Sequence, residues 1–383
     1  MRIAVVTETF HPFKGGSAKR YLEVFKRIVE KGHEVDLFTA RLNADWPSSE
    51  DIYGIRVHRT EEALADFITK DGFRSVRQVL KFAHWALSKL LKDEFDVVEA
   101  NHCPIFPAMT SCIYSRLKSI TLSTTFHEVW HSDWYHYVPR KIYAPIGMML
   151  EGMTTKLPDV AIAVSNMTAQ RLVTFFNMPR DKIRVISNGV DLKLFSNIEC
   201  KRDRSKIIYI GRINPHKNLR WLLDAYKCVK QDYPDVSLEV VGDGPHRAQN
   251  EDYARRNGGK DISFLGQIED AELAKCLKGA EIYVLPSVRE GQSITTLEAM
   301  AAGTPQVVVE TNSSGASNLL QSSGSGLAVK PSSAAIAAGI KFILEDRILW
   351  RRFHENGLKF IAEHSWDRVA DDHLKLYESY LSK

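Results

Sequence analysis

Residues Ile282–Pro305, IYVLPSVREGQSITTLEAMAAGTP, place an apolar strand, a polar loop and a short helix in succession. The strand run lacks apolar–polar alternation, which is typical of parallel strands buried on both faces. The helix is expected to begin around Ser293–Thr295, because Thr295 and Glu298 have capping-box spacing, and to end at Gly303. A strand that leads through a loop into a helix is the building unit of an α/β sheet.

The same alternation of short apolar runs and helical patterns extends through both halves of the 383-residue chain. This rhythm is typical of a parallel sheet with crossover helices, and it predicts two tandem doubly wound, Rossmann-like α/β domains. The strands expected before residue 196 are Ile3–Thr7, Glu34–Thr39, Ile55–His58, Asp96–Ala100, Ile120–Thr125, Val160–Ser165 and Ile183–Ser187. Those expected after it are Ile207–Gly211, Ser237–Val241, Ile262–Leu265, Ile282–Leu285, Gln306–Glu310 and Leu327–Val329.

A polar, basic stretch, Ser196–Ser205, separates the two series of strands and is expected to be an interdomain linker. We therefore predict an N-terminal domain over residues 1–196 and a C-terminal domain over residues 197–365. The last helix, residues 366–383, is expected to pack back toward the N-terminal domain. Doubly wound sheets bind ligands at the carboxyl ends of their strands, so two such edges that face each other would form one cleft.

The composition, 44% hydrophobic and 26% charged, is typical of a globular chain. No apolar run approaches the roughly 18 residues that a membrane span needs, and the opening MRIAVVTETF lacks the features of a signal peptide. The five cysteines are widely spaced, which indicates neither a disulfide framework nor a zinc ribbon. The net charge of +4 is too small to indicate bulk nucleic-acid binding. A cytoplasmic protein is expected.

One segment, Lys70–Lys92, concentrates six basic residues against one acidic residue. The basic residues recur at helical spacing beside aromatic residues, which favours peripheral contact with anionic lipid at the inner face of a membrane. A nearby aromatic cluster supports this interpretation: Trp130, Trp134, Tyr135 and Tyr137. The alternative is the solvated outer face of a packed helix, whose long basic side chains cover apolar surface.

Several positions suit the binding of an anion. Arg212 and Lys217 follow the first strand of the second series, where a doubly wound sheet binds anions. Arg holds phosphate oxygens through its planar fork, and Lys acts as a mobile point charge. The helix that begins around Ser293–Thr295 points its first amides toward the same edge, which attracts phosphate. Between the first strand and helix, Gly15 and Gly16 permit either a tight turn or close approach to a phosphate.

Taken together, these and other motifs resemble the retaining glycosyltransferases of family 4, which have the two-domain GT-B fold. The strongest is the Glu-x7-Glu pair of Glu290 and Glu298. The others are Gly15-Gly16, Lys31-Gly-His-Glu-Val35, Ile186-Ser-Asn-Gly-Val-Asp191, Gly211-Arg212 with Lys217-Asn218, Val241-Gly-Asp-Gly-Pro245 and Ser365-Trp366. The resemblance implies transfer of a hexose from a UDP- or GDP-linked sugar to a hydroxyl of a lipid-linked or glycan acceptor. Retention is implied by the family alone.

The resemblance also implies roles for single residues. Glu290 would hydrogen-bond the donor hexose, and Glu298 would hydrogen-bond the donor ribose. His127 would contact the donor sugar or the transferring centre, with His102 and His131 as rivals at nearby positions. The residues implied in diphosphate binding are Gly15, Gly16, Arg212, Lys217, Ser293, Ile294 and Thr295, and those implied beside the base are Gln267 and Ile268. No dedicated general base is expected, because in this family the leaving phosphate is held to deprotonate the acceptor.

Absent motifs narrow the chemistry. The chain has no Asp-x-Asp, no G-x-G-x-x-G and no G-x4-G-K-[ST], which argues against a metal-bound diphosphate, dinucleotide redox chemistry and a P-loop. No metal and no cofactor beyond the nucleotide-sugar substrate are therefore expected. A nucleotide-sugar epimerase, a phosphorylase or a non-catalytic nucleotide-sugar-binding protein of the same fold stay open as alternatives. The segment Thr311–Asn318 departs from the family pattern because it has no acidic residue, which leaves recognition around the donor open.

Overall fold

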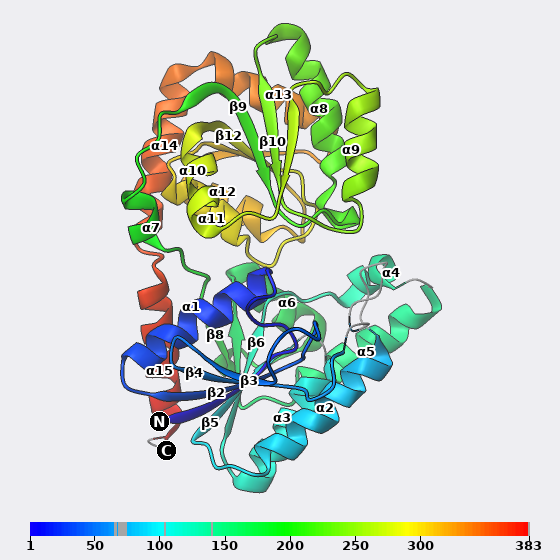
Figure 1. Cartoon of the computed structure of the whole chain (residues 1–383), viewed down its shortest axis with the longest axis vertical. Coiled ribbons are helices and arrows are strands. Elements are labelled where there is room, and N and C mark those ends of the chain that lie inside the picture. The colour runs from blue at the N-terminus through cyan, green and yellow to red at the C-terminus, as the bar shows by residue number, and fades with distance from the viewer. Residues whose placement is uncertain (65–66, 68–74, 103–104, 139–140, 382–383) are drawn as a thin grey trace. The chain divides into compact units, whose positions relative to one another are not determined.

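The chain divides into two compact units in the computed structural model (Figure 1). Unit 1 comprises Met1–Asn188 together with Trp366–Lys383, and unit 2 comprises Gly189–Ser365. The structure describes residues 1–64, 67, 75–102, 105–138 and 141–381, without the side chains of His136 and Tyr137. Within these residues, no helix is both long and apolar enough to cross a membrane.

Unit 1 is built on a sheet with the strand order β3-β4-β2-β1-β5-β6-β7-β8, parallel except for the β3–β4 pair. The strands are β1 Arg2–Val6, β2 Glu34–Thr39, β3 Ser49–Ile52, β4 Ile55–Arg59, β5 Val97–Asn101, β6 Thr121–Phe126, β7 Val160–Ala163 and β8 Ile183–Val185. The helices are α1 Gly16–Glu30, α2 Val76–Leu90, α3 Ile105–Lys118, α4 Trp134–Tyr137, α5 Ala144–Thr154, α6 Asn166–Phe176 and α15 Trp366–Leu381, with short turns η1 His131–Asp133, η2 Lys141–Tyr143 and η3 Arg180–Lys182. The central strand β5 is buried along its whole length, and β1 is buried after Arg2, as their unalternated sequences predict.

Strand β3 has no counterpart among the expected strands. Its sequence, SEDI, is mostly polar and gives no apolar run, because the strand lies at the edge of the sheet and pairs only with β4. Glu50 on β3 forms an ion pair with Arg59 on β4, whose side chain is fully buried. This edge is therefore held by charge as well as by the backbone ladder.

Unit 2 contains a parallel sheet with the order β11-β10-β9-β12-β13-β14. The strands are β9 Asp203–Ile210, β10 Ser237–Val241, β11 Ile262–Gly266, β12 Ala280–Leu285, β13 Gln306–Val309 and β14 Gly326–Val329. The helices are α7 Leu192–Ser196, α8 Leu219–Asp232, α9 Arg247–Arg256, α10 Asp270–Gly279, α11 Ile294–Ala301, α12 Gly315–Ser323, α13 Ser333–Glu345 and α14 Arg347–Ile361, with the turn η4 Pro215–Lys217. Both sheets agree with the expected doubly wound class.

The polar stretch Ser196–Ser205 lies inside unit 2, whereas the sequence suggests a linker between domains there. The unit boundary falls after Asn188, and β9 already begins at Asp203. Arg202, within this stretch, donates to the carbonyl oxygens of Ala280, Ala302 and Gly303. From α10, Lys278 donates to the carbonyl oxygens of Phe195 and Ile198. A polar composition here reflects anchoring to the unit, which composition alone cannot distinguish from a solvated linker.

A buried arginine on α1 organises unit 1. Arg20 is 1% exposed, and its guanidinium donates to the carbonyl oxygens of Ile186 and Ser187 and to Asn188 Oδ1, at 2.9–3.0 Å. The same helix packs against α15, whose Tyr377 hydroxyl donates to the buried Glu99 at 3.3 Å. Arg20 therefore fixes the Ile186–Asn188 segment, which explains structurally why this motif follows the last strand of unit 1.

We expect Arg20→Leu to lower the free energy of unfolding of unit 1 by about 3 kcal/mol, because it strands three buried oxygen acceptors. Urea denaturation followed by circular dichroism measures this change. Arg180→Leu, which removes an exposed arginine of the same unit, should change the stability by no more than about 0.5 kcal/mol. Equal effects of the two substitutions would contradict the role given to Arg20.

Candidate active site

The strand order of unit 2 reverses between β9 and β12. The chain proceeds outward through β10 to β11 on one side and through β13 to β14 on the other. Ligands of doubly wound sheets bind outside the carboxyl ends of the strands at such a reversal. The loop after β9 carries Arg212 and Lys217, and the loop after β12 carries Glu290. Residues that are distant in the sequence thus come together at the edge where binding is expected.

The two loops are joined by an ion pair between Lys217 Nζ and Glu290 Oε1. The side chains are 16% and 10% exposed, so the pair is largely withdrawn from water. Main-chain contacts hold the loops in register, because Val288 N donates to His216 O at 3.2 Å. The Ser287 hydroxyl also lies 3.4 Å from His216 O. The ammonium and the carboxylate are therefore held in position by the fold rather than by their mutual attraction alone.

Glu290 is also fixed through its own backbone. Its amide donates to Ser313 O at 2.9 Å, and its carbonyl accepts from Gly315 N at 2.7 Å. A Cβ on Gly315 would lie 2.2 Å from Gly291 O, so this close approach requires glycine. The segment Thr311–Asn318, which departs from the family pattern in its side chains, thus supports Glu290 with main-chain atoms.

A group of positive charges surrounds His216. Burial and, to a smaller extent, the charges of Lys217, Arg289 and Arg212 together lower the pKa of His216 to about 2. The imidazole is therefore neutral at physiological pH and adds no charge to the three cations. Arg289 is buried and has no place among the expected site residues. Its position directly before Glu290 is the signal that would have identified it.

The Gly211-Arg212 turn is held by the Val241–Pro245 motif. Ile213 N donates to Asp243 O at 2.9 Å, and Gly211 N donates to Val241 O at 3.0 Å. Gly242 has φ of +125°, and a Cβ there would lie 2.1 Å from Gly211 O. The motif therefore positions the backbone that carries Arg212.

Helix α11 begins at Ile294, directly after its N-cap residue Ser293, whose hydroxyl accepts from Thr296 N at 3.2 Å. The expected cap at Thr295 is wrong, because the Thr295 hydroxyl instead lies 2.7 Å from that of Tyr283. Burial raises the pKa of Tyr283, and the carboxylates of Glu290 and Glu298 raise it further. Both carboxylates of the Glu-x7-Glu pair thus lie close enough to act on one phenol, although Glu298 is itself buried within α11.

Gln267 and Ile268 follow β11, at the outer edge of the sheet. Gln267 is exposed and Ile268 is half-buried. They lie at the same carboxyl edge as Arg212, and β10 separates their strand from β9.

In unit 1 the strand order reverses between β1 and β5. The loop after β1 leads to Gly15, the N-cap of α1, and to Gly16, its first residue. At the same edge Asn101 Nδ2 lies 3.4 Å from Glu8 Oε2, and both residues are buried. Glu8 and Asn101 flank the reversal and are absent from the expected site residues. Their polar character at the ends of two apolar strands is the signal that points to them.

His127 follows β6, and its Nε2 is buried without a hydrogen-bond partner among the described residues. Its ring meets Tyr21 edge-on at 5.8 Å. Burial lowers the pKa of His127 to about 3, with smaller effects from Arg20 and His102. A neutral ring with an unused polar nitrogen, at the carboxyl edge of unit 1, suits contact with a ligand.

The rival histidines have structural partners. His102 is buried against Phe126, with a ring separation of 4.2 Å, and its Nε2 lies 3.0 Å from Thr154 Oγ1. His131 stacks on Phe175 at 4.3 Å, and its amide donates to the buried Glu151. These contacts favour His127 over His102, whose ring nitrogen is engaged. His131, like His127, keeps a buried ring nitrogen, Nδ1, without a hydrogen-bond partner among the described residues.

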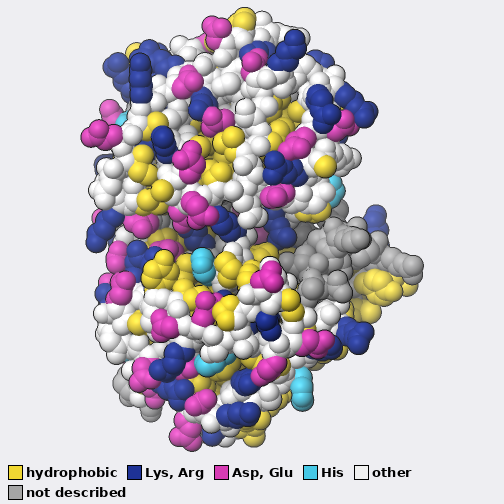
Figure 2. Space-filling view, viewed as in Figure 1, with side chains coloured by type: hydrophobic (Ala, Val, Ile, Leu, Met, Phe, Trp, Pro, Cys, Tyr) yellow, Lys and Arg dark blue, Asp and Glu magenta, His cyan; other side chains and the backbone are white. Residues whose placement is uncertain are grey.

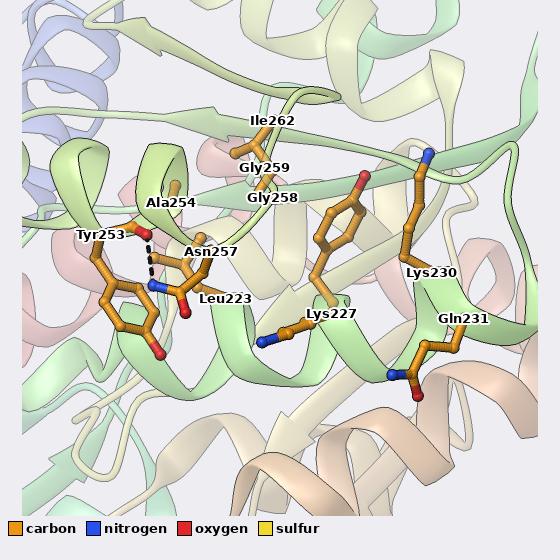
Figure 3. A pocket seen from close by; sticks show the side chains of 11 residues that line it. Leu223, Lys227, Lys230, Gln231, Tyr253, Ala254, Asn257, Gly258, Gly259 and Ile262 are labelled. Carbon is orange, nitrogen blue, oxygen red and sulfur yellow. Dashed lines mark hydrogen bonds between the residues drawn. The ribbon is translucent and has the colours of Figure 1, made fainter.

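Other parts of the described structure are less suited to be the active site. No group of three or more His, Cys, Asp or Glu in the described chain is placed to hold a metal ion. A cavity of about 130 Å³ lies between α8 and α9, lined by residues that include Leu223, Lys227 and Tyr253 (Figure 3). Its remaining wall is the loop that precedes β11, so it lies at the amino edge of the sheet, away from Glu290.

Comparison with known proteins decides the family. Residues 14–194 match the model for Glycosyltransferase Family 4, and residues 193–360 match the model for Glycosyl transferases group 1. The chain belongs to glycosyltransferase family 4. An uncharacterised glycosyltransferase of Methanocaldococcus jannaschii is 28% identical to this family 4 chain, over 99% of this chain and 98% of the relative. The alpha-monoglucosyldiacylglycerol synthase of Streptococcus pneumoniae is 26% identical, over 80% of this chain and 70% of that protein.

Solved structures show the fold of this glycosyltransferase. Sucrose-phosphate synthase from Thermosynechococcus elongatus aligns with a TM-score of 0.82 at 21% identity, over 100% of this chain and 99% of that one. HepE of Anabaena, solved in complex with UDP-glucose, aligns with a TM-score of 0.75 at 17% identity, over 99% and 100% of the chains. The expected GT-B fold is confirmed.

We expect the stability of this glycosyltransferase to fall as the pH is lowered from about 6.5 toward 3, in part through His102. The folded protein holds the pKa of His102 at about 3, whereas the unfolded chain has a value near 6.5 and so binds a proton first. By pH 5 this difference in pKa lowers the free energy of unfolding by about 2 kcal/mol. His102→Gln, whose side-chain amide is long enough to reach Thr154, should remove this part of the pH dependence of stability. Urea titrations at pH 7.5 and pH 5 measure it, and an unchanged pH dependence in the variant would contradict the assignment.

Proposed function

We propose that the chain is a retaining hexosyltransferase that uses a UDP- or GDP-linked sugar. The observation that carries the proposal is the Lys217–Glu290 ion pair at the strand-order reversal of unit 2. Without a ligand, each charge neutralises the other. A donor with a diphosphate and a hexose offers a better partner to each: phosphate oxygens to the ammonium, and sugar hydroxyls to the carboxylate.

The charge of the departing diphosphate is met by several groups in this proposal. Arg212, Lys217 and Arg289 supply positive charge, and the N-terminal amides of α11 at Ser293–Thr295 supply aligned dipoles. Because these groups are held by the fold before the reaction, they stabilise the charge that develops on the leaving group. Such a site works without a metal ion, so addition of EDTA should leave transfer unchanged.

The remaining roles follow the family. Glu298 binds the ribose, Gln267 and Ile268 flank the base, Gly15 and Gly16 approach the distal phosphate, and His127 contacts the transferred sugar. We also propose that the sugar keeps its anomeric configuration during transfer, because the family is known for retaining transfer.

Relatives support a lipid-linked acceptor. The pneumococcal relative is named alpha-monoglucosyldiacylglycerol synthase. A phosphatidyl-myo-inositol mannosyltransferase of Mycobacterium tuberculosis is 32% identical, over 51% of this chain and 53% of that protein. We therefore propose that the chain acts from the cytoplasm on an acceptor at the inner face of a membrane.

We expect one nucleotide family among UDP, GDP and ADP, with their sugars, to raise the melting temperature of the full chain. A ligand that binds only the native state stabilises it by about 2.7 kcal/mol at 100 times its dissociation constant. Thermal shift in millimolar nucleotide measures this effect. No shift with any of these nucleotides would count against the proposal, and turnover of the donor to an epimer without acceptor would indicate an epimerase.

We expect Lys217→Met and Glu290→Gln each to lower kcat by about 10²–10³, because each removes a charge that acts on the transition state. Transfer of radiolabelled sugar measures kcat. Lys206→Met breaks another partly buried ion pair of unit 2, with Glu239, and should leave transfer unchanged. If Glu290→Gln kept both binding and biological function, the chain would be a non-catalytic nucleotide-sugar-binding protein.

A further inference from the structure

Helix α5 of unit 1 exposes a continuous apolar stripe. Ile142, just before the helix, is 75% exposed, and Ile146, Met149 and Met153 are 51%, 58% and 48% exposed. Their spacing of four, three and four residues places them along one face of a helix. Tyr143 is 50% exposed at the same end. Large apolar side chains grouped in this way mark a surface that binds a partner.

The opposite face of α5 is firmly held. Glu151 is 2% exposed, and its carboxylate accepts hydrogen bonds from Trp130 N, His131 N and Trp134 Nε1 at 2.7–2.9 Å. A Cβ on Gly147 would lie 2.5 Å from the Trp134 ring, so the helix packs closely at this point. The stripe is therefore presented by an ordered helix whose other face is satisfied.

The exposed charges of the 141–156 segment have one sign. Lys141 and Lys156, at its two ends, are exposed, whereas Glu151 is the acidic residue of the 141–156 segment and is buried. Figure 2 shows hydrophobic side chains gathered on the projecting part of unit 1, with Lys or Arg side chains above and below them. An apolar helix face with basic ends is typical of a helix that lies in the headgroup region of an anionic bilayer.

A cavity lies at the C-terminal end of the stripe. It has a volume of about 270 Å³, and its lining includes Lys156, Lys182, Phe176 and Met178. Two ammonium groups beside apolar side chains suit the phosphate and the first acyl carbons of an anionic lipid. This feature favours a lipid surface over a protein partner, because it extends the same pairing of positive charge and apolar contact.

The helix α2 is less suited to this role than the sequence suggests. Within the described residues, Lys81 and Lys89 form ion pairs with Glu62 and Glu61, at 3.0 and 2.6 Å. These pairs offset much of the charge that favours α2 as the membrane contact. Lys70 and Arg74 lie outside the described residues.

We infer that the exposed face of α5, from Ile142 to Met153 with Lys141 and Lys156, docks on the surface of an anionic lipid bilayer. The inference does not rest on the proposed sugar transfer, because the contact needs neither donor nor acceptor.

Vesicle flotation of the full chain, without nucleotide, tests the inference. We expect binding to vesicles of phosphatidylcholine with 30% phosphatidylglycerol to be at least tenfold tighter than to phosphatidylcholine alone. I146E/M149E should weaken binding at least tenfold, because two carboxylates would enter the apolar contact. F342E/I348E is the matched control, since it places the same charges at exposed apolar positions of unit 2 and should bind within twofold of the unmodified chain.

Three further measurements separate the alternatives. K141E/K156E should abolish the preference for anionic vesicles, whereas K81E/K89E should bind within twofold of the unmodified chain. Failure of the unmodified chain to bind anionic vesicles, or loss of binding in K81E/K89E but not in I146E/M149E, would overturn the inference. So would a dimer, seen by light scattering, that I146E/M149E converts to monomers with unchanged vesicle binding. Circular dichroism melting confirms that each variant is folded, and a negative vesicle result leaves the transferase proposal intact.

Discussion

The arrangement of the candidate site depends on an opposite-charge pair, Lys217 and Glu290, held where the strand order of unit 2 reverses. A reversal leaves the carboxyl ends of β9 and β12 without a crossover helix above them, so the two loops meet there. The ion pair and the Val288–His216 hydrogen bond then bring an ammonium and a carboxylate to one place. Arg212 and Arg289 add charge to a position that the backbone has already set.

Unit 1 includes the C-terminal helix α15, which is distant in the sequence from the rest of the unit and must be held in place. Buried polar groups do this. Arg20 donates to the carbonyl oxygens of Ile186 and Ser187 and to Oδ1 of Asn188, and Glu99 accepts from the Tyr377 hydroxyl of α15. Buried polar groups are tolerable only when they are hydrogen-bonded, so these contacts also specify one position for each segment. Among the residues that the structure describes, His127 Nε2 of the same unit has no hydrogen-bond partner.

Much of the fold could be predicted from the sequence because parallel strands leave an unbroken apolar signal, and each expected strand has a counterpart. Strand β3 could not, since an edge strand with SEDI carries no such signal. Lys217 and Glu290 could be predicted as site residues from their motifs and positions. Arg289, Glu8 and Asn101 could not, because only the strand order shows that they lie beside a reversal. The prediction of Thr295 as the cap of α11 is wrong, because residue spacing does not show that the Thr295 hydroxyl lies beside the Tyr283 hydroxyl. The α5 stripe was hidden because apolar residues at helical spacing usually face a core.

The support of Glu290 by the segment after β13 has a consequence for how such enzymes diverge. The segment holds Glu290 through an amide and a carbonyl, and Gly315 is constrained by close approach of the backbone. Ser314, Ala316 and Ser317 are buried and are also constrained by packing. The exposed side chains of the segment, Asn312 and Asn318, are thus the ones free to vary during evolution, while an insertion or deletion would displace the carboxylate. Substitutions at these exposed positions can therefore change the surface beside the candidate site without displacing the Glu290 carboxylate.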